Sequence, residues 1–498
     1  MGIIISQSIR NTILSYLGVA LGFIITIWMY PNILSPEQYG LTRVLLSLAM
    51  VSTQLANLGT QNTIIRYFPL FRNKEKKHHG SLFLALLIPA AGLLLLTAVL
   101  YIFRPEITQY FIKRSELLLN YYWLVLPLAF FILFFHVLSS YVRALYDTVM
   151  ASFLMNVVIR LLAVLILILY LFEWITFRQF MIAFVTTYGL VMIWLLIYTF
   201  RQFKVSLKPN LGFLRKPLLK SMGNYSLFAF FGGVASILVN NIDIIMLSSL
   251  AGLSETGIYA IAFYVGSAIT IPRRSVYQIS SPLISDALKN KNFKLVKDIY
   301  SRSSLNMVIA GGFLFCGIIA NIDNLMDLLP PEYAGGAFVI MVIASANVFD
   351  IATGINGAII LNSKYYRFDL YSTLFLIGVT ILLNYLLIPV YGILGAAIGT
   401  GTAVILYNAI KVFYVWLRFS MQPFERQVIY VLLIGAATLL IIFQIPLLFN
   451  TYADIIIRSI IISALYLIPV VSLNISEQFN QLVFDILGTV KTTLLGKP

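Results

Sequence analysis

The feature that most constrains this chain is a run of about 20 apolar residues that recurs from one end of the sequence to the other. Each run is long enough to cross a hydrocarbon core roughly 30 Å thick as a helix. Of the 498 residues, 60% are hydrophobic and only 11% are charged, which is far from the composition of soluble domains. The sequence therefore predicts an all-α, polytopic membrane protein.

We predict fourteen transmembrane helices, with both ends of the chain on the same side of the membrane. The predicted spans are residues 11–31, 41–63, 81–103, 119–141, 152–172, 179–200, 224–250, 257–284, 304–321, 337–361, 369–390, 394–417, 428–447 and 454–474. The last two are almost free of charge, so we expect them to be peripheral to any polar site.

The basic residues distinguish the two sides of the predicted bundle. The net charge is +15, and most basic residues fall in loops on one side, such as 66–77, 201–220 and 289–302. The opposite loops carry few, and we count Arg178 and Arg458 among them. This pattern follows the positive-inside rule and places both termini in the cytoplasm. It is unlike a nucleic-acid-binding patch, so we expect no nucleic acid partner.

Two sequence matches indicate an internal duplication. Leu34–Ala49 (LSPEQYGLTRVLLSLA) aligns with Leu253–Ala268 (LSETGIYAIAFYVGSA), with Gly40 opposite Gly257. A second match, between residues 144–156 and 360–372, has nearly the same offset. Because the offset spans six helices, the repeats share one orientation and are expected to be related by an axis along the membrane normal.

The duplication predicts the domain organisation. We expect an N-lobe at 1–200 (spans 1–6), a linker at 201–223, a C-lobe at 224–418 (spans 7–12) and a C-terminal part at 419–498 with spans 13 and 14 and a cytoplasmic tail. The linker mixes lysine with leucine and phenylalanine, which suits either a segment lying in the inner membrane interface or an ordinary basic loop.

The stretch Gly257–Leu283 is apolar enough to span the membrane, yet it contains Pro272-Arg273-Arg274. An arginine at the centre of a membrane helix costs roughly 2.5–3.5 kcal/mol. Two in succession indicate a wet cavity or an anionic ligand, reached by a helix that Pro272 can bend. The alternative is that the span ends before Pro272 and the arginines extend to the membrane surface.

Other polar residues also fall within predicted spans. The candidates for binding a substrate are Arg43, Arg160, Asn240, Asn241, Arg273, Arg274, Asn347 and Lys411, and the candidates for ion coupling are Asp243 and Asp350. Together they favour a hydrated chamber with a cationic lining. Three structural alternatives stay open. Arg43 sits near a span end and can reach the interface, the aspartates can neutralise arginines in buried pairs, and the asparagines can join helices.

Arginine binds phosphate or pyrophosphate through its planar fork of donors, so an anionic head group fits this chamber. The 29 tyrosines suit sugar faces, although anchoring at the membrane interface explains many of them equally well. The sequence has no Walker loop, HExxH, GxSxG or cysteine–histidine metal spacing. We therefore expect no cofactor and no metal, and an energy source in an ion gradient, the membrane potential or the substrate's own gradient.

Three segments carry a resemblance to a known family. Tyr39–Pro69 resembles the second span and following loop of polysaccharide flippases, Gly257–Ile269 resembles their eighth span, and Asn384–Ala403 is similar to their eleventh-to-twelfth connection. Over its full length the chain resembles the Wzx-type O-antigen and exopolysaccharide flippases. These belong to the superfamily of multidrug, oligosaccharidyl-lipid and polysaccharide exporters, together with lipid II flippases.

The resemblance implies two lobes that alternate between inward and outward openings. It also implies a cargo, an undecaprenyl-pyrophosphate-linked oligosaccharide moved to the outer leaflet of a bacterial inner membrane for cell-surface polysaccharide synthesis. Arg43 and Arg273 or Arg274 occupy places comparable to those of cavity arginines in lipid II flippases, but the first-span Arg-Asp pair of that branch is missing. As partners we expect the lipid-linked glycan, membrane lipids and the polysaccharide polymerase machinery, with the protein itself a monomer and not an enzyme.

Two other functions remain as alternatives. A cation-coupled multidrug exporter of the same fold would need an acidic cavity to hold cationic drugs, whereas this chain places more cations than carboxylates in its spans. A membrane polymerase or ligase of lipid-linked sugars generally needs a long outer loop, and the longest expected here have about fifteen residues.

Overall fold

The computed structural model describes residues 2–103, 105–106, 115–203, 205–208, 216–446, 450–481 and 483–485, leaving out the side chains of 2–6, 8–9 and 274. Throughout these residues the regular elements are helices, which confirms the predicted all-α class. The chain divides into two compact units, Met1–Gly257 and Ile258–Pro498. The lobes and linker expected from the duplication stay a prediction.

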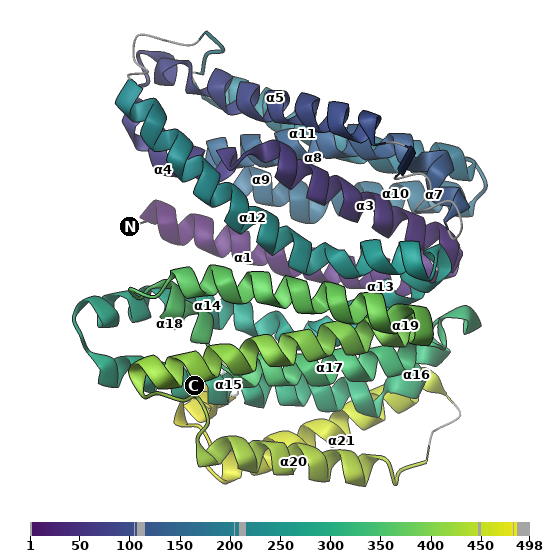
Figure 1. The fold of residues 1–498 in the computed structure, drawn as a ribbon. Helices are drawn as coiled ribbons and strands as arrows, with labels where there is room; N and C mark the ends of the chain where they lie inside the picture. Colours follow the sequence, from purple (N-terminus) through teal and green to yellow (C-terminus); the bar gives the residue numbers. More distant parts are fainter. Residues whose placement is uncertain are drawn as a thin grey trace, which may run out of the picture. The chain divides into compact units, whose positions relative to one another are not determined.

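The first unit contains the helices from α1 to α12 (Figure 1). They are α1 (Gly2–Phe23), η1 (Ile24–Met29), α2 (Tyr30–Ile33), α3 (Pro36–Asn57), α4 (Thr60–Phe71), η2 (Lys77–Gly80), α5 (Ser81–Ile102), α7 (Glu116–Tyr121), η3 (Tyr122–Leu124), α8 (Val125–Ala144), α9 (Val149–Phe153), η4 (Leu154–Val158), α10 (Ile159–Leu171), α11 (Phe177–Gln202) and α12 (Lys216–Leu250).

The second unit begins at Ile258, within α13. Its elements are α13 (Leu253–Ser267), η6 (Ala268–Thr270), α14 (Ile271–Lys289), α15 (Phe293–Ala320), α16 (Ile322–Asp327), η7 (Pro331–Tyr333), α17 (Gly336–Ala352), α18 (Asn356–Leu361), α19 (Arg367–Phe419), α20 (Arg426–Ile442) and α21 (Thr451–Ser472).

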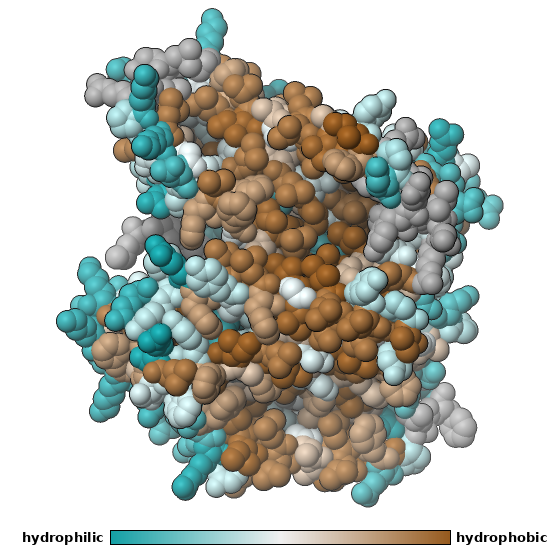
Figure 2. Space-filling view, viewed as in Figure 1, coloured by the Kyte–Doolittle hydropathy of each residue, from teal (hydrophilic) through white to brown (hydrophobic). Residues whose placement is uncertain are grey.

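Many of these helices are long and apolar enough to cross a membrane. Within the described residues nine qualify, or ten when the bent pair α3–α4 is taken as one span. Figure 2 shows hydrophobic side chains over the middles of the helices and hydrophilic ones toward their ends. The chain is therefore a multi-pass membrane protein, while the expected number of fourteen spans stays a prediction.

Local sequence signals set where helices begin and break. Ser35 caps α3 in a reciprocal arrangement with Gln38, in which each backbone N–H donates to the other side chain at 3.2 Å. The α3–α4 pair bends by 42° where Leu58 and Gly59 adopt left-handed conformations. In α19, Gly392 has φ 56° and ψ −129°, which breaks the 53-residue element where two spans, 369–390 and 394–417, were predicted to meet.

Helix α3 lies at the centre of the first unit, where it packs against α5, α8 and α12. Close backbone approach makes this packing possible. A Cβ added to Gly92 of α5 would lie 2.1 Å from the Ala56 carbonyl oxygen of α3, and Gly233 of α12 lies directly against the Gln54 side chain. The unit's core continues into α8, whose Leu133 and Leu138 are fully buried. Small residues let membrane helices approach closely where lipid tails provide no hydrophobic driving force.

Gly40 of α3 and Gly257 of α13 form a reciprocal crossing inside the first unit. A Cβ on Gly40 would lie 1.9 Å from the Leu253 carbonyl oxygen, and a Cβ on Gly257 would lie 2.0 Å from the Pro36 carbonyl oxygen. Residues 36 and 253 have the same sequence offset as residues 40 and 257. The two segments therefore contact each other at equivalent positions of the sequence match.

In the second unit, α15 packs against α14, α17, α20 and α21. The apolar core includes Tyr300 and Val308 of α15 and Tyr466 of α21, all fully buried. The Tyr466 hydroxyl donates to the Ile309 carbonyl at 3.0 Å, so a buried polar group is satisfied where α21 meets α15. The last two helices are thus packed onto the unit rather than attached only by their connecting chain.

The close approach of α3 and α13 at Gly40 can be tested by a substitution that adds one methyl group. We expect Gly40→Ala to destabilise the protein by roughly 1–3 kcal/mol, because the added Cβ meets backbone that cannot rotate away. Gly378→Ala in α19 is the matched control, since a Cβ there has nothing within 4 Å. Thermal unfolding of the detergent-purified chain measures both. Equal melting temperatures for the two variants would contradict the close crossing.

Candidate functional site

Arg273 and Asp350 form an ion pair in the second unit, between α14 and α17. The Asp350 side chain is 8% exposed and that of Arg273 is 35% exposed. Asp350 also accepts a hydrogen bond of 2.7 Å from the Asn408 side chain of α19, and Asn408 accepts one of 3.2 Å from the Thr353 hydroxyl. The pair is therefore fixed on its carboxylate side and open on its guanidinium side.

Lys411 lies one turn beyond Asn408 on α19 and forms a second pair. Its ammonium donates to Asp369 and to the Tyr407 hydroxyl, both at 2.7 Å. The Lys411 side chain is 4% exposed, whereas that of Asp369 is 31% exposed. The break at Gly392 separates Asp369 from Lys411 along α19, so the two halves of this element are joined by the pair.

The two pairs belong to one polar cluster. Tyr277 of α14 interacts electrostatically with Asp369, Lys411 and Arg273. A Cβ on Gly357 would lie 3.1 Å from the Lys411 ammonium, so the missing side chain leaves room for that cation. We define this group, Arg273, Tyr277, Asp350, Asp369, Asn408 and Lys411, as the α14–α17–α19 cluster. Its two cations face two carboxylates, so its charge is balanced.

The structure brings together Arg273, Asp350 and Lys411 from the predicted set, while Asp369 and Asn408 complete the group. Asn347, one helix turn before Asp350, instead donates to the Gly266 carbonyl at 3.1 Å and joins α17 to α13. The side chain of Arg274 lies outside the described residues. Whether any of these residues contacts a substrate stays a prediction.

Arg160 lies in the first unit, against helix α1. Cβ atoms added to Gly18 and Gly22 would lie 3.0 Å from its guanidinium, so the group lies across the two glycines. The Gly18-x-x-x-Gly22 spacing puts both glycines on one helix face. Arg160 follows the π-helix η4, and α1 leads into the π-helix η1. Single π-turns inside helices are frequent at functional sites.

Arg43 of α3 lies among tyrosines. It interacts electrostatically with Tyr30 and Tyr188, and the rings of Tyr30 and Tyr39 are 4.9 Å apart. Its Nε is buried without a hydrogen-bond partner among the described residues. An arginine in aromatic surroundings is suited to hold a planar anion, because the ring edges do not compete for its donors.

The polar residues of α12 differ in their exposure. Asn241 and Asp243 are buried, whereas Asn240 is exposed. Both asparagines donate back to carbonyls four residues earlier, at 2.8 Å for Asn240 and 2.9 Å for Asn241. This bonding is the common way for polar side chains to be satisfied within a membrane helix.

A further ion pair was missed from the sequence. Arg458, which falls in the predicted span 454–474 but was counted with the loop before it, lies buried in α21 and donates to Asp454 at 2.6 Å. Asp454 also accepts from the Asn324 side chain of α16 at 2.6 Å, and Arg458 donates to the Ile445 carbonyl at 2.8 Å. The two charged residues stand four apart on one helix face, which is a readable signal. The last two helices thus do contain a charged pair, which connects them to α16.

Among the described residues there is no group of three or more histidine, cysteine or acidic side chains placed to hold a metal ion. The chemistry that the arrangement supports is ionic. Guanidinium and ammonium groups are held by carboxylates inside an apolar bundle, ready to exchange partners with another anion.

Solved structures of membrane transporters share this fold. The lipid II flippase MurJ in an inward closed conformation matches with a TM-score of 0.70 at 14% identity, covering 96% of this chain and all of that one. An inward-facing multidrug resistance MATE family transporter of the MOP superfamily matches with a TM-score of 0.63 at 14% identity, covering 82% of this chain and 98% of that one. The chain therefore has the helical membrane fold that these two proteins share.

The sequence comparison identifies the family. The family model described as polysaccharide biosynthesis protein matches residues 6–287, more than half of the chain, and the chain belongs to this family. An uncharacterized membrane protein of Methanocaldococcus jannaschii is 22% identical over 96% of this chain and 97% of its own length. The resemblance drawn from the three sequence segments is thereby confirmed.

The buried Arg458–Asp454 pair is expected to be structural. Asp454→Ala should cost roughly 3–5 kcal/mol, because it leaves the Arg458 cation buried without its carboxylate. The double variant Asp454→Ala/Arg458→Met should recover most of this loss, since neither charge then remains. Urea or thermal unfolding of the purified variants measures the difference. A double variant no more stable than Asp454→Ala alone would contradict the assignment.

Proposed function

We propose that this protein flips a lipid-linked oligosaccharide, of the undecaprenyl-pyrophosphate type, from the cytoplasmic to the outer leaflet by alternating access. Membership of the polysaccharide biosynthesis family supports a role in making cell-surface glycans. The likeness of its fold to that of a lipid II flippase, over 96% of the chain, supports a lipid-linked cargo. On this proposal the chain transports its cargo and performs no catalysis.

The observation that carries the proposal is the Arg273–Asp350 pair. Its carboxylate is buried and held by Asn408, while the Arg273 side chain is 35% exposed. A diphosphate offers oxygens in the planar, bidentate arrangement that arginine prefers. A pyrophosphate head group can therefore replace Asp350 as the partner of Arg273 without leaving the cation uncompensated.

Partner exchange supplies a simple coupling step. When the diphosphate binds Arg273, the Asp350 carboxylate loses its cation inside an apolar bundle, and a coupling ion can take the place of that cation. Release of the cargo on the other side restores the original pair and expels the coupling ion. Asp243, the other buried carboxylate predicted to couple ions, is the second candidate for this role.

Three further assignments belong to the same proposal. The excess of basic residues in the loops on one side favours both termini in the cytoplasm of a bacterial cell, with the protein in its inner membrane. Arg43 and Arg160 are proposed as additional contacts for the head group. The glycan polymerase machinery is the expected protein partner of an otherwise monomeric chain.

A cation-coupled multidrug exporter is the second candidate, and the fold shared with a MATE transporter favours it. A cationic drug needs a carboxylate free to receive it. In the Arg273–Asp350 pair the arginine side chain is 35% exposed and the aspartate side chain 8%. The more accessible partner of this pair is thus the cation, which favours an anionic cargo there.

Removal of Arg273 should stop export even when the protein is stable. In a strain lacking the gene, we expect Arg273→Ala to lower the rate of export of lipid-linked repeat units by roughly tenfold or more, since a charge-assisted hydrogen bond contributes about 1.5–3 kcal/mol. The double variant Arg273→Ala/Asp350→Asn removes both charges and should fold well, yet it should export as slowly. The measurement is the amount of repeat units trapped in the inner leaflet.

The matched control is Arg302→Ala, which removes an arginine from the exposed pair with Asp298 in α15 and should leave export unchanged. If the double variant restores export, Arg273 serves only to neutralise Asp350, and the proposed contact with cargo is wrong. Normal cell-surface glycan and reduced drug resistance in the deletion strain would favour the exporter instead.

A further inference from the structure

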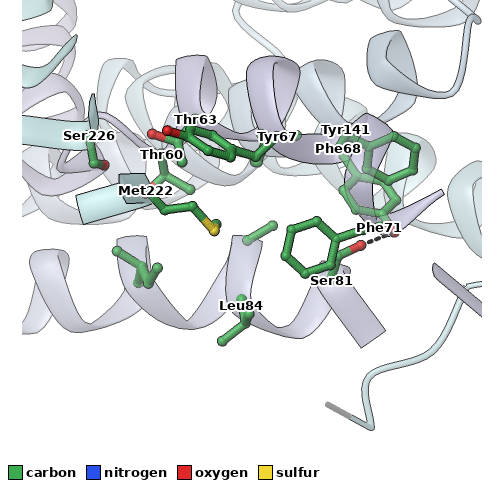
Figure 3. A pocket seen from close by; sticks show the side chains of 13 residues that line it. Thr60, Thr63, Tyr67, Phe68, Phe71, Ser81, Leu84, Tyr141, Met222 and Ser226 are labelled. Carbon is green, nitrogen blue, oxygen red and sulfur yellow. Dashed lines mark hydrogen bonds between the residues drawn. The ribbon is translucent and has the colours of Figure 1, made fainter. Parts of the chain in front are cut away.

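A groove runs along helix α4 in the first unit, away from the residues considered above. It lies between α4, α5, α8 and the first turns of α12. Figure 3 shows Tyr67 and Phe71 on the α4 side, Met222 of α12 reaching into the space and Leu84 on the α5 wall. The lining is predominantly apolar.

The length of the groove matches one leaflet of a membrane. It extends from Thr60 to Phe71, the two ends of α4, which is about 16 Å at 1.5 Å per residue. Half of a hydrocarbon core roughly 30 Å thick is about 15 Å. Ile88, 40% exposed, lines its side, so the groove is accessible from the apolar surface of α5.

Basic residues lie beside the groove, with Arg66 within α4, Arg72 directly after it and Lys220 in the first turns of α12. The Arg66 guanidinium stacks on Tyr225 of α12 at 4.3 Å from the ring centroid, and that of Arg72 stacks on Tyr146 at 4.0 Å. Lys220 precedes Ser221, whose hydroxyl lies 2.8 Å from that of Tyr67 in the groove wall. The exposed loop after α4 adds Lys74, Lys76 and Lys77, against one acidic residue, Glu75.

The apolar groove and its basic rim together define a ligand with an acyl chain and a negative head. We propose that the groove binds an anionic phospholipid, with one acyl chain along α4 and the phosphate among Arg66, Arg72 and Lys220. Basic pockets between membrane helices bind anionic head groups in this way. The inference is independent of the cargo, because none of these residues belongs to the α14–α17–α19 cluster or to the surroundings of Arg43 and Arg160.

The polar residues in the wall are compatible with this occupant. The Ser81 and Tyr141 hydroxyls bond to each other at 3.0 Å beside Phe71, as the dashed line in Figure 3 shows. The Thr63 hydroxyl donates to the Gly59 carbonyl at 3.0 Å, and that of Ser226 to the Leu58 carbonyl at 2.6 Å. These four hydroxyls are satisfied within the protein, whereas the Thr60 hydroxyl, also in the wall, is buried without a hydrogen-bond partner among the described residues.

Native mass spectrometry of the full-length protein in detergent tests the proposal. The protein is incubated with phosphatidylglycerol or phosphatidylethanolamine of identical acyl chains, and the bound lipid is counted. We expect a clear preference for phosphatidylglycerol that Arg66→Gln/Lys220→Gln reduces by about fivefold or more, since each basic residue near an anionic lipid contributes appreciably. Lys289→Gln/Lys291→Gln, two charges removed from the second unit, should leave the preference unchanged.

The groove itself is tested by filling it. Ala85→Phe puts a ring into the lined space, whereas Ala98→Phe, on the exposed face of the same helix α5, does not. We expect Ala85→Phe to abolish retention of phosphatidylglycerol and Ala98→Phe to leave it intact. Leu84→Trp, from the half-buried wall, replaces Ala85→Phe if that variant fails to fold.

Three results would overturn the proposal. The first is that the unaltered protein retains the two lipids equally. The second is that the filled variants retain as much phosphatidylglycerol as Ala98→Phe does. The third is that glycerophosphoglycerol, which has the head group but no acyl chains, displaces the lipid. Binding of a polyprenyl phosphate at this groove in place of phosphatidylglycerol would count against it as well.

Discussion

A charge inside a hydrocarbon layer must be compensated, and this requirement governs how the polar residues of the chain are arranged. Arg273 faces Asp350, Lys411 faces Asp369 and Arg458 faces Asp454. A buried ion pair adds little net stability, because desolvation offsets most of the attraction, but breaking one by removing a single partner is costly. Such pairs therefore persist only where each charge keeps a counterion, from the protein or from a ligand.

Because of this requirement, two of the cations predicted to line a chamber are paired with carboxylates rather than bare. The Arg273 and Lys411 cations predicted to line it are neutralised by carboxylates from the same unit, and Asn408 connects the two pairs along α19. On the proposed function, attraction for an anionic head group arises through exchange of partners rather than through a standing positive potential.

Hydropathy and local signals predicted much of the fold. The apolar runs gave the all-α membrane class, and the offset between Gly40 and Gly257 pointed to segments that the structure brings into reciprocal contact. The charged pairs were harder to predict, because Arg273 and Asp350 are 77 residues apart in the sequence. Only the packing of α14 against its neighbours decides which carboxylate faces which cation. Two signals were readable but overlooked, the Gly18-x-x-x-Gly22 spacing that receives Arg160 and the four-residue spacing of Asp454 and Arg458.

The central claim is that Asp350 and an anionic head group compete for Arg273. The most direct measurement is the affinity of the purified protein for a short-chain prenyl pyrophosphate, compared between the unaltered protein, Asp350→Asn and Arg273→Ala. Competition predicts that Asp350→Asn binds about tenfold more tightly and that Arg273→Ala binds far more weakly. Equal affinity in all three proteins would contradict the account.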